Sequence, residues 1–322
     1  MAVTHHSRKK KWILGLTAGL VVLLIVSGSF IAWEIGRGVG EGVLHCNEGN
    51  DTRANSVAML ADWGYDLAAF QSRWPEEALT VLSADGTAIP VGVYRPEVAP
   101  VGSAILVHGQ GGDRLSVAPL AEMYLERGYA VYAMDQRASG ESASPLVSFG
   151  YFEKDDVAAM VDFAEQQSPQ LPVVVHGQSM GAATAAQYAA TAHGRQNLDA
   201  LVLDSSFDNM KHMVLGVMEM DGITGAFFAF CADLYLRARY GFVFGDVDAV
   251  KQAADITAPA MIIQCTRDEI APVEVGRSLF EAVDHPDKVY WEADSDHIEA
   301  AIDDPAAYAE QVFHFLKEAL SI

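Results

Sequence analysis

The sequence predicts an α/β fold in which helices cover both faces of a mostly parallel central sheet, with one transmembrane helix before it. Two patterns predict this arrangement. Short, β-branched apolar runs alternate with amphipathic stretches from residue 101 onward, and residues 12–33 contain no charged side chain. The chain has 322 residues, of which 51% are hydrophobic and 20% are charged. That composition supports a large buried core and excludes intrinsic disorder as the main state.

The uncharged segment from Trp12 to Trp33 is long enough to cross a membrane. As an α-helix its 22 residues would span about 33 Å, against about 30 Å for the hydrocarbon core of a bilayer. Tryptophan at both ends suits the two interfacial regions, and four bases at residues 8–11 predict a cytoplasmic N-terminus. We therefore expect a cytoplasmic basic tail at 1–11, a transmembrane helix at 12–33 and an extracytoplasmic remainder.

A cleaved signal peptide is the alternative for this segment. Signal peptides have a shorter apolar region, of about 7 to 15 residues, followed by a cleavage site with small residues. Ser27 and Ser29 match such a site only weakly, so the length of the run favours an uncleaved anchor. Both interpretations place the rest of the chain outside the cytoplasm.

The charge and the cysteine content exclude several classes of protein. Beyond residue 33 the chain carries 17 bases and 43 acids, and this balance argues against a nucleic-acid-binding surface. Three cysteines are too few for a disulfide framework and lack the paired spacing of a zinc site. We expect Cys46, Cys231 and Cys265 to be free thiols unless one pair is bridged.

Two kinds of segment precede the main α/β pattern. Residues 34–50 contain five glycines without apolar periodicity, which predicts a flexible juxtamembrane linker and places the folded domain at 51–322. A short helical stretch is expected at 54–70. Apolar and polar residues then alternate on both sides of Asp85-Gly86, which is the strongest hairpin signal in the chain.

Six apolar runs are the predicted strands of the parallel sheet, and amphipathic stretches such as 152–167 and 181–193 are the predicted helices between them. One interval is too long for a single crossover helix and is rich in methionine and aromatic residues. We expect it to form an inserted helical cap, at about 207–255, over the carboxyl-terminal edge of the sheet. The predicted strands are 103–109, 129–135, 172–177, 199–205, 260–265 and 288–293.

The strongest chemical motif is a G-x-S-x-G pentapeptide, Gly177-Gln178-Ser179-Met180-Gly181, which follows a predicted strand and opens a predicted helix. In a nucleophile elbow this context exposes the serine hydroxyl at the sheet edge, and glycines avoid collisions in the tight turn. We therefore expect Ser179 to be a nucleophile and the backbone N–H of Met180 to be one donor of an oxyanion hole. The alternative is a strand-to-helix turn with an idle serine.

A glycine-rich loop, HGQGG at 108–112, ends the predicted strand at 103–109. The backbone N–H of Gln110 is the candidate second donor of the oxyanion hole, since the glycines let this loop approach a bound substrate closely. His108 in this loop and His176 beside the elbow are expected to orient their surroundings by hydrogen bonds rather than to take part in the chemistry.

A serine nucleophile needs a base, and the base needs an orienting acid. His297 is the candidate base, because among the histidines after Ser179 it alone follows the last predicted strand at the edge where the serine lies. Asp268 occupies the equivalent loop one strand earlier and is the candidate acid, while Asp204, one strand earlier still, is its rival. The other histidines lie in predicted helices, in the insertion or at the opposite edge: His193, His212, His285 and His314.

With these motifs the sequence is similar to the α/β-hydrolases, in particular to a membrane-anchored bacterial branch with lysophospholipase-like and serine-peptidase-like members. The resemblance spans residues 77–320 and is carried, in family order, by HGQGG, MDQRASGES, GYFEKDD, GQSMG, LDSSF, RARYGFVFGDV, CTRDEIAP and DSDHIEA. It implies the α/β-hydrolase fold, a catalytic triad, an oxyanion hole and no cofactor. The implied residues are Ser179, Asp268 and His297 for the triad, and Gln110 and Met180 for the oxyanion hole.

Three kinds of function are compatible with these motifs. A carboxylic-ester hydrolase acting on a small acyl ester is favoured, because the methionine- and phenylalanine-rich insertion suits varied apolar groups. A serine peptidase or amidase acting on a peptide-like substrate is an alternative on the same fold. The third is a catalytically silent surface module, and the intact set of triad candidates weighs against it.

Overall fold

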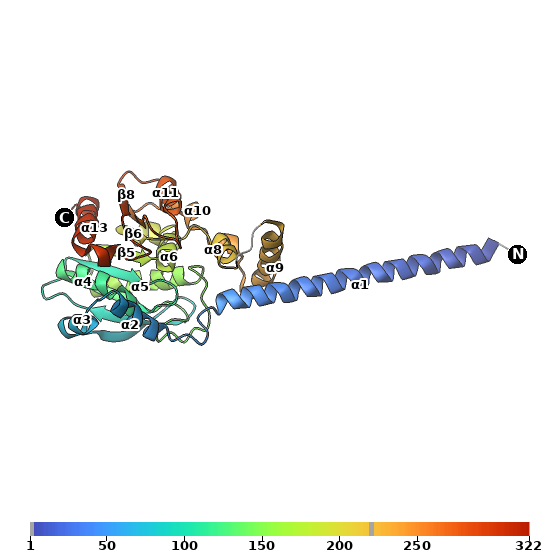
Figure 1. Ribbon diagram of the computed structural model, residues 1–322, viewed down its shortest axis with the longest axis horizontal. Coiled ribbons are helices and arrows are strands. Elements are labelled where there is room, and N and C mark those ends of the chain that lie inside the picture. Colours follow the sequence, from blue (N-terminus) through green and yellow to red (C-terminus); the bar gives the residue numbers. More distant parts are fainter. Residues whose placement is uncertain (1–2, 219–221, 322) are drawn as a thin grey trace.

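The computed structural model describes residues 3–218 and 222–321, and its centre is one eight-stranded sheet in the order β1-β2-β4-β3-β5-β6-β7-β8 (Figure 1). The strands are β1 (Glu77–Leu82), β2 (Ala88–Tyr94), β3 (Gly102–Val107), β4 (Tyr129–Met134), β5 (Val173–Gln178), β6 (Ala200–Asp204), β7 (Ala260–Cys265) and β8 (Lys288–Ala293). Strands β3 to β8 are parallel, and β1 and β2 form an antiparallel hairpin that joins them through β4. The predicted hairpin and all six predicted parallel strands are confirmed.

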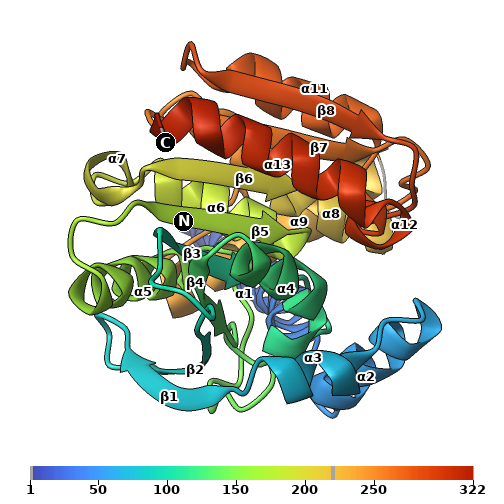
Figure 2. The ribbon, with the colours of Figure 1, turned by 90° about the vertical axis from the view of Figure 1, so that its left-hand side faces the viewer.

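Helices cover both faces of this sheet. They are α2 (Thr52–Asp62), α3 (Leu67–Arg73), α4 (Ala118–Glu126), α5 (Glu153–Gln167), α6 (Met180–Ala189), α7 (Gly194–Asn197), α10 (Ala249–Ala253), α11 (Val273–Ala282), α12 (Ala300–Asp303) and α13 (Pro305–Leu320), with a 3-10 turn η1 (Arg114–Val117). Successive strand residues point to opposite faces, so in β3 Ile105 faces one buried cluster and Leu106 faces the other. The first cluster is covered by α5, α6, α10 and α11, and the second by α2, α3, α4 and α13 (Figure 2).

The helical stretch predicted at 54–70 is divided into α2 and α3. The chain turns between them at Gly64, whose φ of +71° lies in the left-handed region that glycine adopts at little cost. Asp66 then caps α3 by accepting a hydrogen bond from the N–H of Ala69 at 2.9 Å. A glycine turn followed by an N-cap residue therefore separates the two helices.

The long interval between β6 and β7 holds α8 (Met210–Val217), α9 (Gly222–Tyr240) and a 3-10 turn η2 (Phe244–Asp246), before α10 returns the chain to the sheet. This is the insertion predicted at about 207–255, of which residues 219–221 lie outside the described residues. Buried side chains of α8 and α9 belong to a third apolar cluster that also includes Phe149 and Met180. The insertion therefore shares an apolar cluster with the residue that follows Ser179.

Helix α1 (Val3–Leu44) is continuous, so the prediction of a flexible linker at 34–50 is wrong. The glycines of this segment permit close packing instead, because Gly36 and Gly40, four residues apart, face α9. A Cβ atom at Gly36 would lie 2.0 Å from the backbone oxygen of Cys231, closer than real side chains come. The end of α1 is therefore packed against the insertion rather than loosely tethered to it.

The remainder of α1 projects from the folded body (Figure 1). This helix is long and apolar enough to cross a membrane, and an 18-residue stretch within Trp12–Leu44 has a mean hydropathy of 2.3. Its large apolar side chains from Trp12 to Ile31 are exposed. Such a helix near the N-terminus fits a membrane anchor or a signal sequence.

Candidate active site

The register of the strands brings the predicted site segments to one edge of the sheet. β3 pairs with β5 so that Val107 lies beside Gly177, and β5 pairs with β6 so that Gln178 lies beside Asp204. Because these strands are parallel, the loop that carries Gln110 and the turn after β5 begin at the same edge.

Ser179 occupies a sharp turn between β5 and α6. Its φ of 54° and ψ of −119° are strained for a residue other than glycine, and such strain persists only where the surrounding packing enforces it. Glycine is needed on both sides of the turn. A Cβ atom at Gly177 would lie 2.2 Å from the backbone oxygen of Gly181, and one at Gly181 would lie 2.0 Å from that of Val107. This is the backbone geometry of a nucleophile elbow.

Three side chains from three strand ends meet at this turn. Oγ of Ser179 lies 2.9 Å from Nε2 of His297, and Nδ1 of His297 lies 2.7 Å from a carboxylate oxygen of Asp268. Ser179 follows β5, Asp268 follows β7 and His297 follows β8. The Asp268 side chain is fully buried and that of His297 is 15% exposed, so the imidazole–carboxylate pair is largely shielded from water.

Hydrogen bonds fix the orientation of this group. Oδ1 of Asp268 accepts from the backbone N–H groups of Ile270 and Ala271 at 2.9 and 2.7 Å, which leaves Oδ2 for the imidazole. When Nδ1 of His297 carries its proton toward Asp268, Nε2 is free to accept the proton of Ser179. The arrangement can therefore deprotonate an attacking serine and stabilise the imidazolium that results.

Asp204, the alternative acid, makes other contacts. Its carboxylate accepts hydrogen bonds from Gln178 at 3.0 Å, Ser205 at 2.9 Å and Tyr308 at 2.8 Å. In the part of the chain that the structure describes, it forms no hydrogen bond with His297. Burial raises the pKa of Asp204 above its usual range. Asp204 thus joins β6 to the elbow strand and to α13 instead of orienting the imidazole.

His176 and His108 have the supporting positions expected from the sequence. His176 is buried between the hydroxyl groups of Tyr124 at 3.2 Å and Tyr308 at 3.1 Å, and burial lowers its pKa to about 3. Nε2 of His108 accepts a hydrogen bond from the backbone N–H of Gln136 at 3.0 Å. His176 therefore stays neutral in the core, and His108 joins the ends of β3 and β4.

The loop after β3 lies against Ser179. A Cβ atom at Gly109 would lie 3.3 Å from the Cβ of Ser179, so glycine allows the loop to come close. Met180 begins α6, and the first N–H groups of a helix have no acceptor within it. The predicted oxyanion donors, the N–H groups of Gln110 and Met180, thus belong to the two segments that flank the serine.

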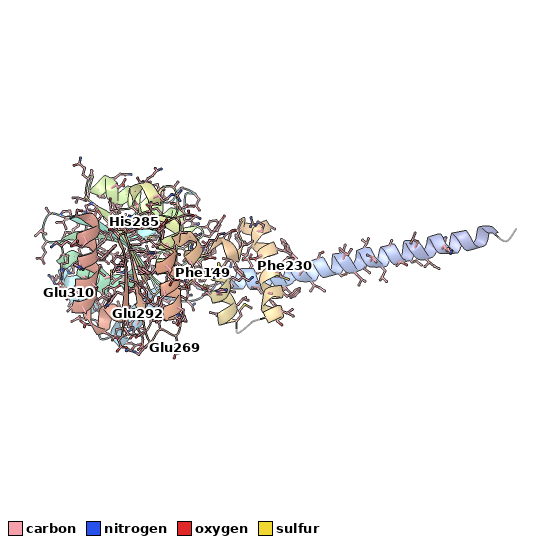
Figure 3. The ribbon with its side chains drawn as sticks, turned by 90° about the horizontal axis from the view of Figure 1, so that it is seen from above. Phe149, Phe230, Glu269, His285, Glu292 and Glu310 are labelled. Carbon is pink, nitrogen blue, oxygen red and sulfur yellow. The ribbon has the colours of Figure 1, made fainter. Side chains whose placement is uncertain are left out.

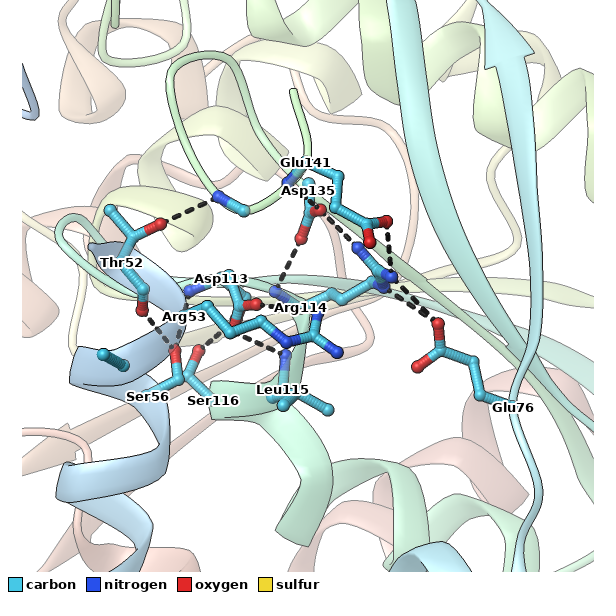
Figure 4. A network of polar contacts seen from close by, with 12 residues as sticks. Thr52, Arg53, Ser56, Glu76, Asp113, Arg114, Leu115, Ser116, Asp135 and Glu141 are labelled. Carbon is cyan, nitrogen blue, oxygen red and sulfur yellow. Dashed lines mark hydrogen bonds and ion pairs between the residues drawn. The ribbon is translucent and has the colours of Figure 1, made fainter. Parts of the chain in front are cut away.

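A network of ion pairs, centred on a buried arginine, fixes the segment that follows this loop (Figure 4). The guanidinium of Arg114, in η1, is buried and pairs with Asp135, with Glu76 at 2.9 Å and with Glu141 at 2.8 Å. Asp135 also accepts a hydrogen bond from the backbone N–H of Arg114 at 2.9 Å. The sequence did not predict this network, because its members come from separate segments. The motif MDQRASGES, which contains Asp135 and Glu141, is the signal that could have found it.

The end of α1 reaches the same region, which the sequence did not indicate. The side chain of Gln110 donates a hydrogen bond to Asn47 at 2.9 Å, and Asn47 donates one to the carbonyl of Ala138 at 3.1 Å. A cavity of about 1080 Å³ is lined by residues of 41–52 and 138–145, and Ser179 is not among them. The segment predicted to be a linker therefore borders the loop beside the serine.

The described residues contain no group of three or more His, Cys, Asp or Glu side chains that is placed to hold a metal ion. Cys46, Cys231 and Cys265 are all described and none of them is bridged. Burial raises the pKa of the Cys265 thiol to about 12, so this group stays protonated at neutral pH.

Most of this chain is similar to known proteins and to solved structures. Residues 105–228 match the family model of the alpha/beta hydrolase fold. The uncharacterized protein YqkD of Bacillus subtilis is 25% identical over 267 residues, which cover 82% of this chain and 87% of that protein. A monoacylglycerol lipase of Mycolicibacterium smegmatis is 25% identical over 240 residues, which cover 64% of this chain and 85% of that protein. The structure of a Pyrococcus furiosus esterase is similar with a TM-score of 0.62 at 22% identity, over 79% of this chain and 94% of that one.

The parallel sheet, the strained serine turn and these similarities define the fold class of the protein as the α/β architecture of that family model. The chain has the α/β-hydrolase fold. The fold class that the sequence motifs predicted is thereby confirmed.

Proposed function

We propose that this α/β-hydrolase is a serine hydrolase that cleaves carboxylic esters through an acyl-enzyme. The observation that carries the proposal is the continuous hydrogen-bonded chain from Ser179 through His297 to Asp268, with distances of 2.9 and 2.7 Å. In this assignment Ser179 is the nucleophile, His297 is the general base and acid, and Asp268 orients the imidazole.

Each step of the proposed reaction uses one of these groups. Oγ of Ser179 attacks the ester carbonyl while its proton moves to Nε2 of His297. The N–H groups of Gln110 and Met180 donate hydrogen bonds to the oxyanion, and one such donor contributes about 10²–10³ in rate. The imidazolium then protonates the leaving alcohol, and an acyl ester remains on Ser179. Water, deprotonated by His297, releases the acid and restores the serine.

An ester substrate is supported by the apolar surroundings and by the named activities of similar proteins. The third apolar cluster contains Met180, which follows the nucleophile directly, and Phe149, Met210 and Val214. The similar proteins from Pyrococcus furiosus and Mycolicibacterium smegmatis are an esterase and a monoacylglycerol lipase.

A substrate panel with the full-length protein in detergent tests this proposal. We expect labelling by a fluorophosphonate, and faster turnover of p-nitrophenyl esters than of peptide anilides with the same acyl group. Ser179→Ala removes both signals, whereas Ser278→Ala, which alters an exposed serine on α11, changes neither. Preference for the anilides would assign a peptidase or amidase instead, and absence of labelling would favour a catalytically silent module.

We further infer that α1 remains attached and crosses the membrane with its N-terminus in the cytoplasm. Four bases at residues 8–11 precede the exposed apolar part of the helix, as expected for the cytoplasmic side. The protein should then stay in the membrane fraction at high salt and alkaline pH, and external protease should digest its folded domain on intact cells. Recovery of a soluble protein without its first residues would instead indicate a cleaved signal peptide.

A further inference from the structure

Helix α9 carries an exposed apolar face. The side chain of Ile223 is 92% exposed and that of Phe230 is 58% exposed, with Phe227 and Leu234 exposed at 47% and 48%. Their spacing of four, three and four residues places all four on one side of the helix. A row of large exposed apolar side chains marks a surface that binds a membrane or another protein.

The opposite side of α9 is already in contact with the protein. Ala229, Ala232 and Leu236 are buried in the third apolar cluster, and Gly36 of α1 packs directly against the backbone of Cys231. The acid of this helix, Asp233, accepts a hydrogen bond from the backbone N–H of Phe244 at 2.9 Å and so points to the folded body. On the outer face from Ile223 to Leu234, the described residues therefore present large apolar side chains and no charged ones.

The position of α9 relative to α1 indicates what covers this face. Figures 1 and 3 both show α9 lying across α1 where α1 leaves the folded body, and Phe230 is labelled there in Figure 3. The rings of Trp33, at the end of the apolar span, and Tyr235 of α9 are 5.0 Å apart in an edge-on contact. A membrane crossed by residues 12–33 would therefore begin at the level of α9.

The charges near this face suit lipid headgroups. The last turn of α9 carries Arg237 and Arg239, although the chain as a whole has a net charge of −22. The Arg237 side chain is 61% exposed, with Asp246 at 3.6 Å, so it remains accessible to solvent and to phosphate. Aromatic residues and arginines beside an apolar face are the composition of helices that lie in the membrane interface.

We propose that α9 is a membrane-docking helix that lies in the plane of the interface, with Ile223, Phe227, Phe230 and Leu234 among the lipid acyl chains. Because α9 is packed on α1, the two helices hold the folded body at a fixed height and orientation on the bilayer. This surface goes beyond the proposed ester hydrolysis, and it rests on the proposed membrane span of α1 rather than on that activity.

Site-directed fluorescence in vesicles tests the docking. An environment-sensitive fluorophore is attached to the full-length protein at Phe230→Cys, in a Cys46→Ser background because Cys231 and Cys265 are buried. The protein is reconstituted in phosphatidylethanolamine–phosphatidylglycerol vesicles whose acyl chains carry bromine, which quenches fluorophores within the hydrocarbon. Leu23→Cys in the apolar span is the positive control. Glu310→Cys on α13, at the far end of the molecule in Figure 3, is the water-exposed control.

The proposal predicts that the label at position 230 is quenched nearly as strongly as the label at 23, and about threefold or more relative to the label at 310. Ile223→Cys repeats the measurement at the most exposed of these four apolar side chains, where little packing is lost on substitution. Quenching at 23 with none at 223 and 230 would overturn the docking and leave the anchor intact. Quenching at none of these sites would overturn both. Self-quenching between labels at 230 that grows with protein density, without any effect of bromine, would assign the face to a second copy of this chain.

Discussion

The elbow and the α1–α9 junction use glycine in the same way. A Cβ atom at Gly181 would lie 2.0 Å from the backbone oxygen of Val107, and one at Gly36 would lie 2.0 Å from that of Cys231. In both places the missing side chain allows two backbone segments to touch. The first contact shapes the proposed catalytic turn, and the second joins the apolar N-terminal helix to the insertion.

The two regions differ in whether a local sequence pattern reveals the contact. The glycines of the elbow lie within a local strand-turn-helix pattern, so the sequence itself indicates that they allow the tight turn at Ser179. Gly36 meets a helix about 195 residues later, which no local pattern reveals. A glycine-rich segment therefore indicates flexibility only where no distant backbone packs on it.

The largest expected effect is the loss of the catalytic groups. Ser179→Ala and His297→Ala should each reduce ester turnover by on the order of 10⁴ or more, because members of a triad act as a unit. Steady-state kinetics with a soluble ester, together with circular dichroism, measures this effect. Turnover within tenfold of the unaltered protein, in a correctly folded variant, would contradict the assignment.

The two buried acids should differ in their effect on catalysis. Asp268→Asn should reduce turnover by on the order of 10³–10⁴, because asparagine neither fixes the imidazole tautomer nor stabilises the imidazolium. Asp204→Asn should cost much less turnover, since the Asp204 carboxylate bonds to Gln178, Ser205 and Tyr308 rather than to His297. A larger loss in the Asp204 variant would move the orienting acid to β6.

Substituting each glycine by alanine tests whether the two backbone contacts have different roles. Gly181→Ala should abolish activity, because its Cβ would collide with the strand that ends at Val107. Gly36→Ala should retain activity on a soluble ester but lower the free energy of unfolding by about 1–3 kcal/mol, the usual cost of overpacking. Chemical unfolding of the full-length protein in detergent measures this cost.

Gly38→Ala is the matched control on the same helix. No atom of the described residues lies within 4 Å of a Cβ built at Gly38, so alanine there should leave stability unchanged or raise it by up to about 1 kcal/mol. Equal effects of Gly36→Ala and Gly38→Ala would show that the packing of α1 on α9 contributes nothing.

A smaller effect than the losses of catalysis is a loss of stability in acid. The pKa of His176 is about 3 in the folded protein, below its ordinary value of about 6.5, so the unfolded chain binds a proton that the folded chain does not. Stability should therefore fall as pH drops from about 6.5 toward 3, with about 2 kcal/mol lost between pH 7 and pH 5. His176→Gln should reduce this dependence and the exposed His212→Gln should not, as unfolding at both pH values can measure. The same pH dependence in the protein with and without His176 would argue against this origin.

Local patterns were sufficient for most of the fold and for the proposed catalytic groups. The strands carry their own alternation, and Ser179, Asp268 and His297 each follow a recognisable strand, so chain order predicted that they would meet but left Asp204 as a rival acid. The contacts that the sequence did not predict join segments that lie far apart in the chain and meet only in the folded structure. Asn47 reaches Gln110 across 63 positions of sequence, and Tyr308 reaches Asp204 across 104.

The most direct test of the account is to trap the acyl-enzyme. The full-length protein is mixed with a slowly hydrolysed p-nitrophenyl ester, quenched in acid during turnover and digested, and the acylated peptide is identified by mass spectrometry. We expect one acyl group per chain, attached to Ser179, and no accumulation of this acyl-enzyme in His297→Ala. An acyl group on another residue, or continued turnover without any acylated peptide, would contradict the proposal that Ser179 is the nucleophile.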